Sequence, residues 1–191
     1  GVIVTPIYKG GSSLVALDEI TGQIKWSYGP MASSEGDESL MRFECASTAG
    51  SGTVYANYIL DNIKGDTHID SEYGVIAFEI TTGRVKWRRQ ICRLQPGKFD
   101  GSFGGVRRNR IRSFSTPPIY HEGTVYVHSN AGAVAAMDSL SGRIKWLMRY
   151  PYHPGVHALS RQFGGGWGSY MMSEPSFWLN QRPLVVGEQL F

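Results

Sequence analysis

The sequence VALDEITGQIKW at residues 15–26 decides the fold of this chain, because the chain repeats it twice with few changes. The second copy, IAFEITTGRVKW, occupies residues 76–87, and the third, AAMDSLSGRIKW, occupies residues 135–146. In each copy an apolar run precedes a Thr-Gly or Ser-Gly pair, and a second apolar run ends on tryptophan. Glycine adopts the positive φ of a tight turn at no steric cost. Each copy therefore predicts a strand, a turn and an outer strand that ends at the tryptophan.

A second repeated motif precedes the later two copies of the first. It stands as GTVYANYIL at residues 52–60 and as GTVYVHS at residues 123–129, each after a polar stretch that predicts one more strand. One unit thus contains four strands, and the units recur with a period of about 60 residues. Four-stranded antiparallel sheets that are hydrophobic on both faces stack radially as propeller blades. We predict an all-β propeller; a β-helix or a solenoid of hairpins is the alternative, although such repeats are usually shorter than about 45 residues.

The composition agrees with a globular all-β chain. Of the 191 residues, 41% are hydrophobic, 12% are aromatic and 24 are glycine, and no long stretch has the apolar spacing of an amphipathic helix. The formal charge of +3 is too small for the basic surface that usually binds nucleic acid. No apolar run approaches the roughly 18 residues of a membrane-spanning helix. We therefore expect neither a nucleic-acid partner nor a membrane span.

The repeats predict parts of four blades. Residues 1–26 would supply the last three strands of one blade, residues 27–87 and 88–146 would each form a complete blade, and residues 147–191 would supply the first strands of another. Propellers usually close with about four to eight blades. About three blades make an incomplete ring. We expect either a piece of a longer polypeptide or a subunit whose open strand edges pair with another copy or with a partner protein.

The repeated twelve-residue motif at residues 15–26, 76–87 and 135–146 resembles the tryptophan-docking motif of the pyrroloquinoline-quinone-like β-propeller family, Ala-x-Asp-x-x-Thr-Gly-x-x-x-Trp. The matching positions are Ala16, Asp18, Thr21, Gly22, Trp26, Ala77, Glu79, Thr82, Gly83, Trp87, Ala136, Asp138, Ser141, Gly142 and Trp146. The resemblance implies that these residues fasten one blade to the next. Quinoprotein alcohol dehydrogenases and non-catalytic proteins share this motif, and members are often exported. The resemblance therefore implies an extracytoplasmic location: periplasmic, lumenal or secreted.

The dehydrogenases of this family imply further features: an adjacent cysteine pair over the quinone, a tryptophan beneath it, and a Glu-Asn-Asp set that holds calcium. Cys45 and Cys92 are not adjacent, and no calcium set matches by motif. The two cysteines could form one disulfide or remain thiols. Trp167 or Trp178 could lie under a quinone, although blade packing is the simpler role. No cofactor and no catalytic residue is assigned; pyrroloquinoline quinone (PQQ) and calcium belong only to the alternative function.

The repeats differ first between their second and third strands, where the second repeat carries the extra sequence DNIKGDTHIDSEYG. Asp66, His68 and Asp70 in this insertion are weak candidates for holding a divalent cation, because carboxylate oxygens are the ligands that calcium prefers. The spacing lacks the complete pattern of a calcium loop. A solvated acidic hairpin is the competing interpretation.

A second difference is the basic and aromatic stretch KFDGSFGGVRRNRIRSF at residues 98–114. Its candidate interaction residues are Arg107, Arg108, Arg110, Arg112 and Phe103. Arginines among aromatic residues can bind carboxylates, phosphates or an acidic partner, while a basic surface loop is the simpler interpretation. The sequence thus predicts a non-catalytic scaffold for protein interaction that is part of a larger propeller. The alternative is a fragment of a PQQ-dependent quinoprotein alcohol dehydrogenase.

Overall fold

A computed structural model describes residues 1–7, 12–30, 41–43, 45, 47–64, 67–94, 116–129, 132–150, 185–186 and 189–190. All regular structure in these ranges is β-strand, which confirms the all-β prediction. Over the same residues, no helix has the length and apolar character needed to cross a bilayer.

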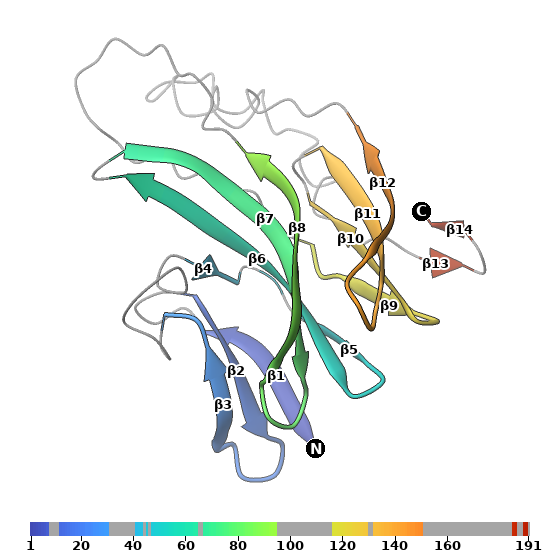
Figure 1. The fold of residues 1–191 in the computed structure, drawn as a ribbon. Coiled ribbons are helices and arrows are strands. Elements are labelled where there is room, and N and C mark those ends of the chain that lie inside the picture. Colours follow the sequence, from blue (N-terminus) through green and yellow to red (C-terminus); the bar gives the residue numbers. More distant parts are fainter. Residues whose placement is uncertain are drawn as a thin grey trace, which may run out of the picture.

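The strands form three antiparallel sheets and one separate hairpin (Figure 1). The first sheet contains β1 (Val2–Ile7), β2 (Ser13–Asp18) and β3 (Ile24–Tyr28). The second contains β4 (Met41–Arg42), β5 (Thr48–Gly50), β6 (Thr53–Lys64), β7 (Thr67–Glu79) and β8 (Val85–Leu94). The third contains β9 (Ile119–His121), β10 (Thr124–His128), β11 (Ala133–Asp138) and β12 (Ile144–Arg149). The hairpin pairs β13 (Val185–Val186) with β14 (Gln189–Leu190).

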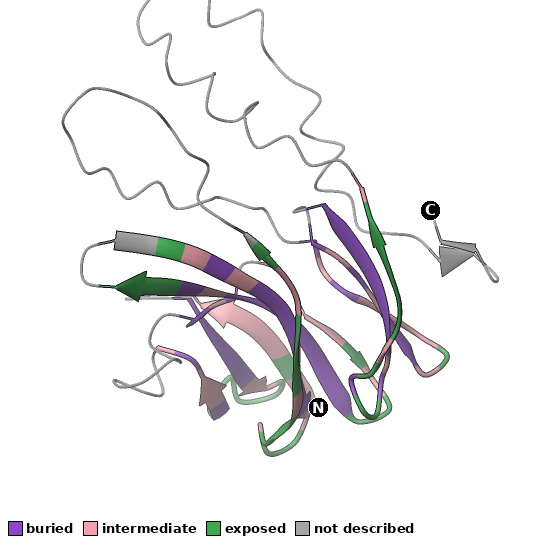
Figure 2. Ribbon diagram, turned by 45° about the horizontal axis from the view of Figure 1, so that its top comes forward, coloured by how far each residue is buried: buried purple, intermediate pink, exposed green. Residues whose placement is uncertain are grey.

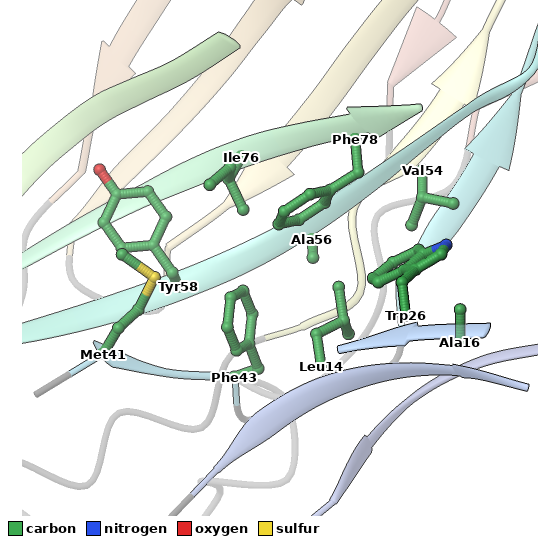
Figure 3. Close-up of a cluster of buried hydrophobic side chains, with 10 residues drawn as sticks. All are labelled: Leu14, Ala16, Trp26, Met41, Phe43, Val54, Ala56, Tyr58, Ile76 and Phe78. Atoms are coloured by element: carbon green, nitrogen blue, oxygen red, sulfur yellow. The ribbon is translucent and has the colours of Figure 1, made fainter. Parts of the chain in front are cut away.

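The three sheets stack face to face in chain order, and in the described part of the chain they do not close into a ring (Figures 1 and 2). Side chains alternate along β6, as they must in a strand that is buried on both faces. Val54, Ala56 and Tyr58 pack toward the first sheet, while Tyr55 and Ile59 pack toward the third. The cluster between the first and second sheets, drawn in Figure 3, comprises Leu14, Ala16, Trp26, Met41, Phe43, Val54, Ala56, Tyr58, Ile76 and Phe78.

The same irregularity interrupts the outer strand of each sheet. The alanine of each repeated twelve-residue motif lies opposite its tryptophan, and a β-bulge follows this pair. The lysine before the tryptophan therefore has no partner across the ladder. The alanine–tryptophan pairs are Ala16–Trp26, Ala77–Trp87 and Ala136–Trp146, and the bulged lysines are Lys25, Lys86 and Lys145. A bulge redirects a side chain. Lys86 and Lys145 point back across their sheets and donate to Thr53 and Thr124 at 2.8 and 2.7 Å.

The prediction that each outer strand ends at its tryptophan was wrong. β3 continues to Tyr28, β8 to Leu94 and β12 to Arg149, since pairing with the preceding strand goes on beyond the indole. The tryptophan ring lies on the face of the sheet and therefore does not interrupt the ladder. The first strand of the second sheet also differs from a simple strand, because β4 and β5 pair separately with β6.

The antiparallel connections give the stack two distinct ends (Figure 1). The turn end holds the β2–β3, β5–β6, β7–β8, β9–β10 and β11–β12 turns. At the opposite end β6 and β7, 12 and 13 residues long, run beyond their counterparts β10 and β11, which have 5 and 6 residues. We call this extension, residues 58–64, 67–73 and 91–94, the arm. The insertion in the second repeat thus lengthens β6 and β7, and the added length forms the arm.

Candidate functional site

The three repeated turns have one backbone geometry. Gly22, Gly83 and Gly142 have φ values of 69°, 72° and 67°, and each donates from its N–H, at 2.9 Å, to the carbonyl of the acidic residue four positions earlier. Only glycine adopts this left-handed conformation without strain. The turns are therefore set by backbone requirements that are the same in all three sheets.

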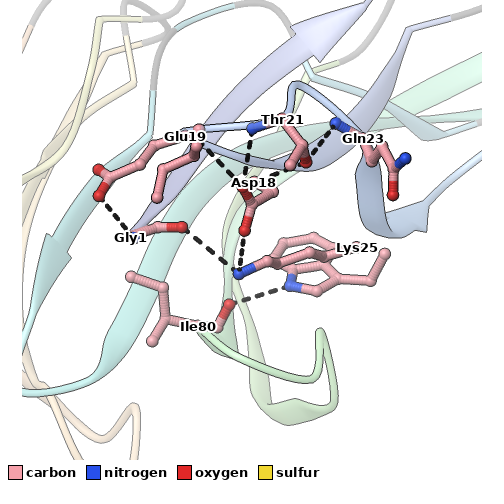
Figure 4. A network of polar contacts seen from close by, with 9 residues as sticks. Gly1, Asp18, Glu19, Thr21, Gln23, Lys25 and Ile80 are labelled. Carbon is pink, nitrogen blue, oxygen red and sulfur yellow. Dashed lines mark hydrogen bonds and ion pairs between the residues drawn. The ribbon is translucent and has the colours of Figure 1, made fainter.

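The acidic residue of each turn is bound by the turn itself, as Figure 4 shows for Asp18. Asp18 Oδ1 accepts from the Ile20 and Thr21 N–H groups at 3.0 and 2.9 Å, and Asp138 Oδ1 accepts from the Ser141 N–H at 2.9 Å and hydroxyl at 2.7 Å. The longer Glu79 side chain instead accepts from the Thr82 hydroxyl at 2.7 Å. These carboxylates have structural partners within their own turns.

Hydrogen bonds hold the pKa of both aspartates below the ordinary value. The bond to Lys25 is the main cause at Asp18, followed by the Thr21 and Ile20 amides, and the Ser141 hydroxyl is the main cause at Asp138. A depressed folded-state pKa stabilises the fold above the unfolded value of about 3.9, and this stabilisation is lost as pH falls through the folded value.

We therefore predict a steeper acid dependence for the native protein than for an Asp18→Asn/Asp138→Asn variant. Between about pH 4 and pH 2 the free energy of unfolding, measured by urea titration at each pH, should fall faster in the native protein. Parallel curves for the two proteins would show that these carboxylates do not stabilise the turns.

The tryptophans of the first two sheets contact the turn of the following sheet. Trp26 Nε1 donates to the Ile80 carbonyl at 3.0 Å, and Trp87 Nε1 donates to the Ser139 carbonyl at 3.0 Å. Trp146 is 42% exposed, and its indole N–H makes no hydrogen bond to another described residue. The repeated contact thus joins the first sheet to the second and the second to the third.

The turn glycines lie directly against these rings. A Cβ atom built on Gly83 would come within 2.5 Å of the Trp26 ring, and one built on Gly142 would come within 2.6 Å of the Trp87 ring. A Cβ atom on Gly22 would meet nothing within 4 Å. At two of the three positions, glycine therefore provides both the turn conformation and the space for an indole. Only the first of these two reasons can be inferred from the sequence.

The second and third sheets share two further polar contacts. Arg89 Nε donates to the Gly142 carbonyl at 2.9 Å, and the Tyr55 hydroxyl donates to the Ser139 carbonyl at 3.3 Å. Arg89 lies two residues beyond the repeated tryptophan motif, and Tyr55 lies in the repeated Gly-Thr-Val-Tyr stretch. The role of Arg89 was missed because its counterparts in the other sheets are Tyr28 and Met148, so that no repeated pattern marks the position.

A different set of polar groups lies where β6, β7 and β8 enter the arm. The Tyr58 hydroxyl donates to Glu72 at 2.5 Å, Arg88 Nη2 donates to the same carboxylate at 3.0 Å, and the Arg88 guanidinium lies 4.6 Å from the centre of the Tyr58 ring. Burial and the Glu72 carboxylate raise the pKa of Tyr58. A Cβ atom on Gly74 would come within 2.6 Å of the Tyr58 ring. This cluster is fixed by a cation–π contact, two hydrogen bonds and a close backbone approach.

Two further ion pairs belong to the arm. Arg42 binds Asp61 through Nε and Nη2, at 3.1 and 3.2 Å, and the Ser71 hydroxyl donates to Asp61 at 2.7 Å. Arg93 lies 3.6 Å from Asp70. A cavity of about 320 Å³ lies beside these residues and is lined by Leu60, Asp61, Asn62, Ile63, Asp70, Glu72, Arg88 and Arg93. Since Asp61 is only 6% exposed, the expectation of a hairpin with solvated acids is wrong at this position.

The weak metal candidates are not brought together by the described structure. Asp70 pairs with Arg93, while Asp66 and the side chain of His68 lie outside the described residues. Within the described part of the chain, no three His, Cys, Asp or Glu side chains are grouped as metal ligands. Other candidates also lie outside it: Arg107, Arg108, Arg110, Arg112, Phe103, Trp167 and Trp178. Their assignments stay predictions.

The described residues do not fit the cysteine and calcium features of the quinone-dependent enzymes. Cys45 and Cys92 are not joined in a disulfide, and Asn57 Nδ2 lies 3.8 Å from Cys45 Sγ. Burial raises the pKa of the Cys92 thiol. The arm carboxylates Asp61 and Glu72 are bound by arginines rather than placed together as an oxygen-ligand set.

The three stacked antiparallel sheets share the same turn before the outer strand and the same bulge within it. This arrangement defines the chain as a segment of a β-propeller. The model of the family described as outer membrane protein assembly factor BamB matches residues 2–163. The chain belongs to this family, whose propellers are of the PQQ-like type. No curated protein sequence matches the chain.

The solved structures that match the chain include a BamB protein and two quinohemoprotein alcohol dehydrogenases. BamB from Moraxella catarrhalis is 17% identical with a TM-score of 0.46, and the match covers 78% of this chain and 33% of that one. Quinohemoprotein alcohol dehydrogenase ADHIIG from Pseudomonas putida HK5 is 19% identical with a TM-score of 0.47, covering 78% and 19%. The Comamonas testosteroni quinohemoprotein alcohol dehydrogenase is 21% identical with a TM-score of 0.43, covering 78% and 21%. The match thus spans one third or less of each of these proteins.

Proposed function

We propose that the chain is a non-catalytic segment of a PQQ-like propeller and acts as a structural scaffold for protein interaction. The observation that carries this proposal is the division between the two ends of the stack. At the turn end, the polar atoms of Asp18, Trp26 and Trp87 are bound within the protein. The arm differs in holding a cavity of about 320 Å³ whose lining includes the charged side chains of Arg88 and Arg93. The description of the family as an assembly factor supports a role in contacting other proteins.

The proposal includes further blades and an extracytoplasmic location. Trp26 and Trp87 each lie on a following sheet, and the partly exposed Trp146 has the same place in the third sheet. A fourth blade, from residues 147–191 and the rest of a longer polypeptide, would give its indole an equivalent acceptor. Export of family members supports a periplasmic, lumenal or secreted site of action.

A quinone titration tests the non-catalytic part of the proposal. When the complete polypeptide is titrated with PQQ in the presence of calcium, we expect no saturable absorption band and no dye-linked oxidation of alcohols. A stoichiometric quinone band accompanied by alcohol oxidation would contradict the proposal and assign the protein to the dehydrogenases.

Site-specific cross-linking tests the scaffold part. A photoreactive amino acid at Asn62 in the arm should give discrete protein adducts in the producing cells, because this residue lines the arm cavity and is exposed. The matched position is Gln23, which is also exposed but lies at the turn end. We expect adducts from position 62 and none from position 23. Absence of adducts at position 62, or equal labelling at both, would contradict a partner surface at the arm.

A further inference from the structure

β8 forms one edge of the second sheet. It is 10 residues long, and within the described residues only β7 pairs with it. The corresponding outer strands, β3 and β12, have 5 and 6 residues. An edge strand presents unpaired backbone N–H and C=O groups that can accept another strand. The second sheet therefore offers a longer edge than either neighbour.

The exposed side chains of β8 are mainly cationic. Lys86, Arg88, Arg89 and Arg93 are all exposed along the strand, with Arg84 immediately before it. Nearby acids balance this charge in part: Glu72 pairs with Arg88, Asp70 with Arg93 and Glu79 with Arg84. Lys86 and Arg89 bind a hydroxyl and a carbonyl instead, so the edge keeps an excess of positive charge.

Three of these cations have no basic counterpart in the other sheets. The positions that match Arg88 in the first and third sheets are Ser27 and Leu147, and those that match Arg89 are Tyr28 and Met148. Arg93 lies in the arm, where the shorter strands have no counterpart. Arg88, Arg89 and Arg93 are thus specific to the second sheet and lie along its long edge strand, whereas Arg84 and Lys86 match Arg143 and Lys145 of the third sheet.

We propose that the β8 edge binds an extended acidic segment of a partner protein, which adds to the second sheet as a further strand. Backbone hydrogen bonds would supply affinity, and side chains on one face would supply specificity. Carboxylates of the added strand would lie beside Arg88 and Arg93, the two arginines that also line the arm cavity. Two basic edges repel each other, so the same charges disfavour pairing between copies of this chain. This inference rests on the proposed scaffold function and identifies the chemistry of its partner.

The test uses a labelled peptide of alternating Thr, Val and Glu residues, with fluorescence anisotropy as the measurement. The complete polypeptide should bind this peptide with an affinity that falls as salt rises. It should bind neither a peptide with lysine in place of glutamate nor a glutamate peptide with a central proline, because proline removes a ladder donor. Equal binding of all three peptides, or no binding of the glutamate peptide, would overturn the inference.

Variants locate the binding site. Arg88→Gln/Arg93→Gln should weaken the peptide complex by about three- to tenfold, as expected for the loss of two partly exposed ion pairs. Arg88→Lys/Arg93→Lys keeps the charges and should retain most of the affinity. The matched control Arg143→Gln/Lys145→Gln changes the outer strand of the third sheet and should have no effect. Arg93→Gln alone, in a side chain that is 57% exposed, gives the same direction of change if the double variant is unstable. Equal weakening by the control would overturn the location.

The outcomes also separate this inference from the proposed function. If the glutamate peptide does not bind while cross-links persist from position 62, the strand-addition inference fails and the scaffold function stands. If cross-links are absent and a quinone band appears, the scaffold function itself fails.

Discussion

Replacing Trp26 or Trp87 with alanine is expected to lower the free energy of unfolding by about 3–5 kcal/mol, the usual cost of removing a large buried aromatic side chain, with the partly buried Trp87 at the lower end. Trp26 is only 8% exposed and packs on Phe78 with ring centres 5.6 Å apart, in addition to its bond to Ile80. The Trp87 ring lies against Gly142 in the third sheet. Each replacement would remove packing contacts between two sheets, because each indole lies between its own sheet and the following one.

Trp146→Ala is the matched control for these two variants. Trp146 has the same position in its sheet and packs against Tyr126, but it is 42% exposed. Its replacement should therefore cost clearly less than replacement of Trp26 or Trp87, as measured by urea unfolding of the 191-residue chain. Equal losses at all three positions would contradict the distinction between two indoles that contact a following sheet and a third that has no such contact among the described residues.

Gly142→Ala is expected to lower the free energy of unfolding by about 2–5 kcal/mol, from two contributions. A left-handed conformation costs a residue with a Cβ atom roughly 1–2 kcal/mol. Displacing a packed ring adds about 1–3 kcal/mol, and here the added Cβ atom would lie 2.6 Å from the Trp87 ring. Gly83→Ala should behave in the same way because of Trp26.

Gly22→Ala separates the two contributions. The φ of Gly22 is 69°, close to that of Gly142, but a Cβ atom there meets nothing within 4 Å. The substitution should therefore cost only about 1–2 kcal/mol, from backbone strain alone. Chemical denaturation of the three glycine variants checks the order, and a loss at Gly22 as large as that at Gly142 would contradict it.

Much of the fold could be predicted from the sequence because the repeats encode local structure. The turn glycines, the alternation along residues 53–58 and the short spacing between strands are local signals, and each led to a strand or turn found in the structure. Repetition strengthened them, since one motif in three places excludes coincidence. The described residues accordingly form an all-β chain of stacked antiparallel sheets.

The contacts between sheets could not be predicted residue by residue. The bulge that directs Lys86 toward Thr53 is a property of strand register, which the sequence does not state. The burial of Asp61 depends on Arg42, which reaches it from a separate short strand. Such pairings depend on which segments meet in space.

The candidate site shows the same limit. The insertion in the second repeat was identified because it breaks the period, but its acids suggested solvent or a metal. Arginines from β4 and β8 bind them instead, and these strands are remote from the insertion in sequence. Differences between repeats thus located the arm, whereas its chemistry required the structure.

The central claim is that the repeated twelve-residue motif joins one sheet to the next, because its indole packs on the turn glycine of the following sheet. A double-mutant cycle of Trp87→Ala and Gly142→Ala, measured by urea unfolding, tests it most directly. Without the indole, the Cβ atom added at position 142 has no ring to displace and only the backbone strain remains. We therefore predict that the double variant loses about 1–3 kcal/mol less than the sum of the two single losses. Additivity within about 0.5 kcal/mol would contradict the claim, because residues that do not share a contact behave independently.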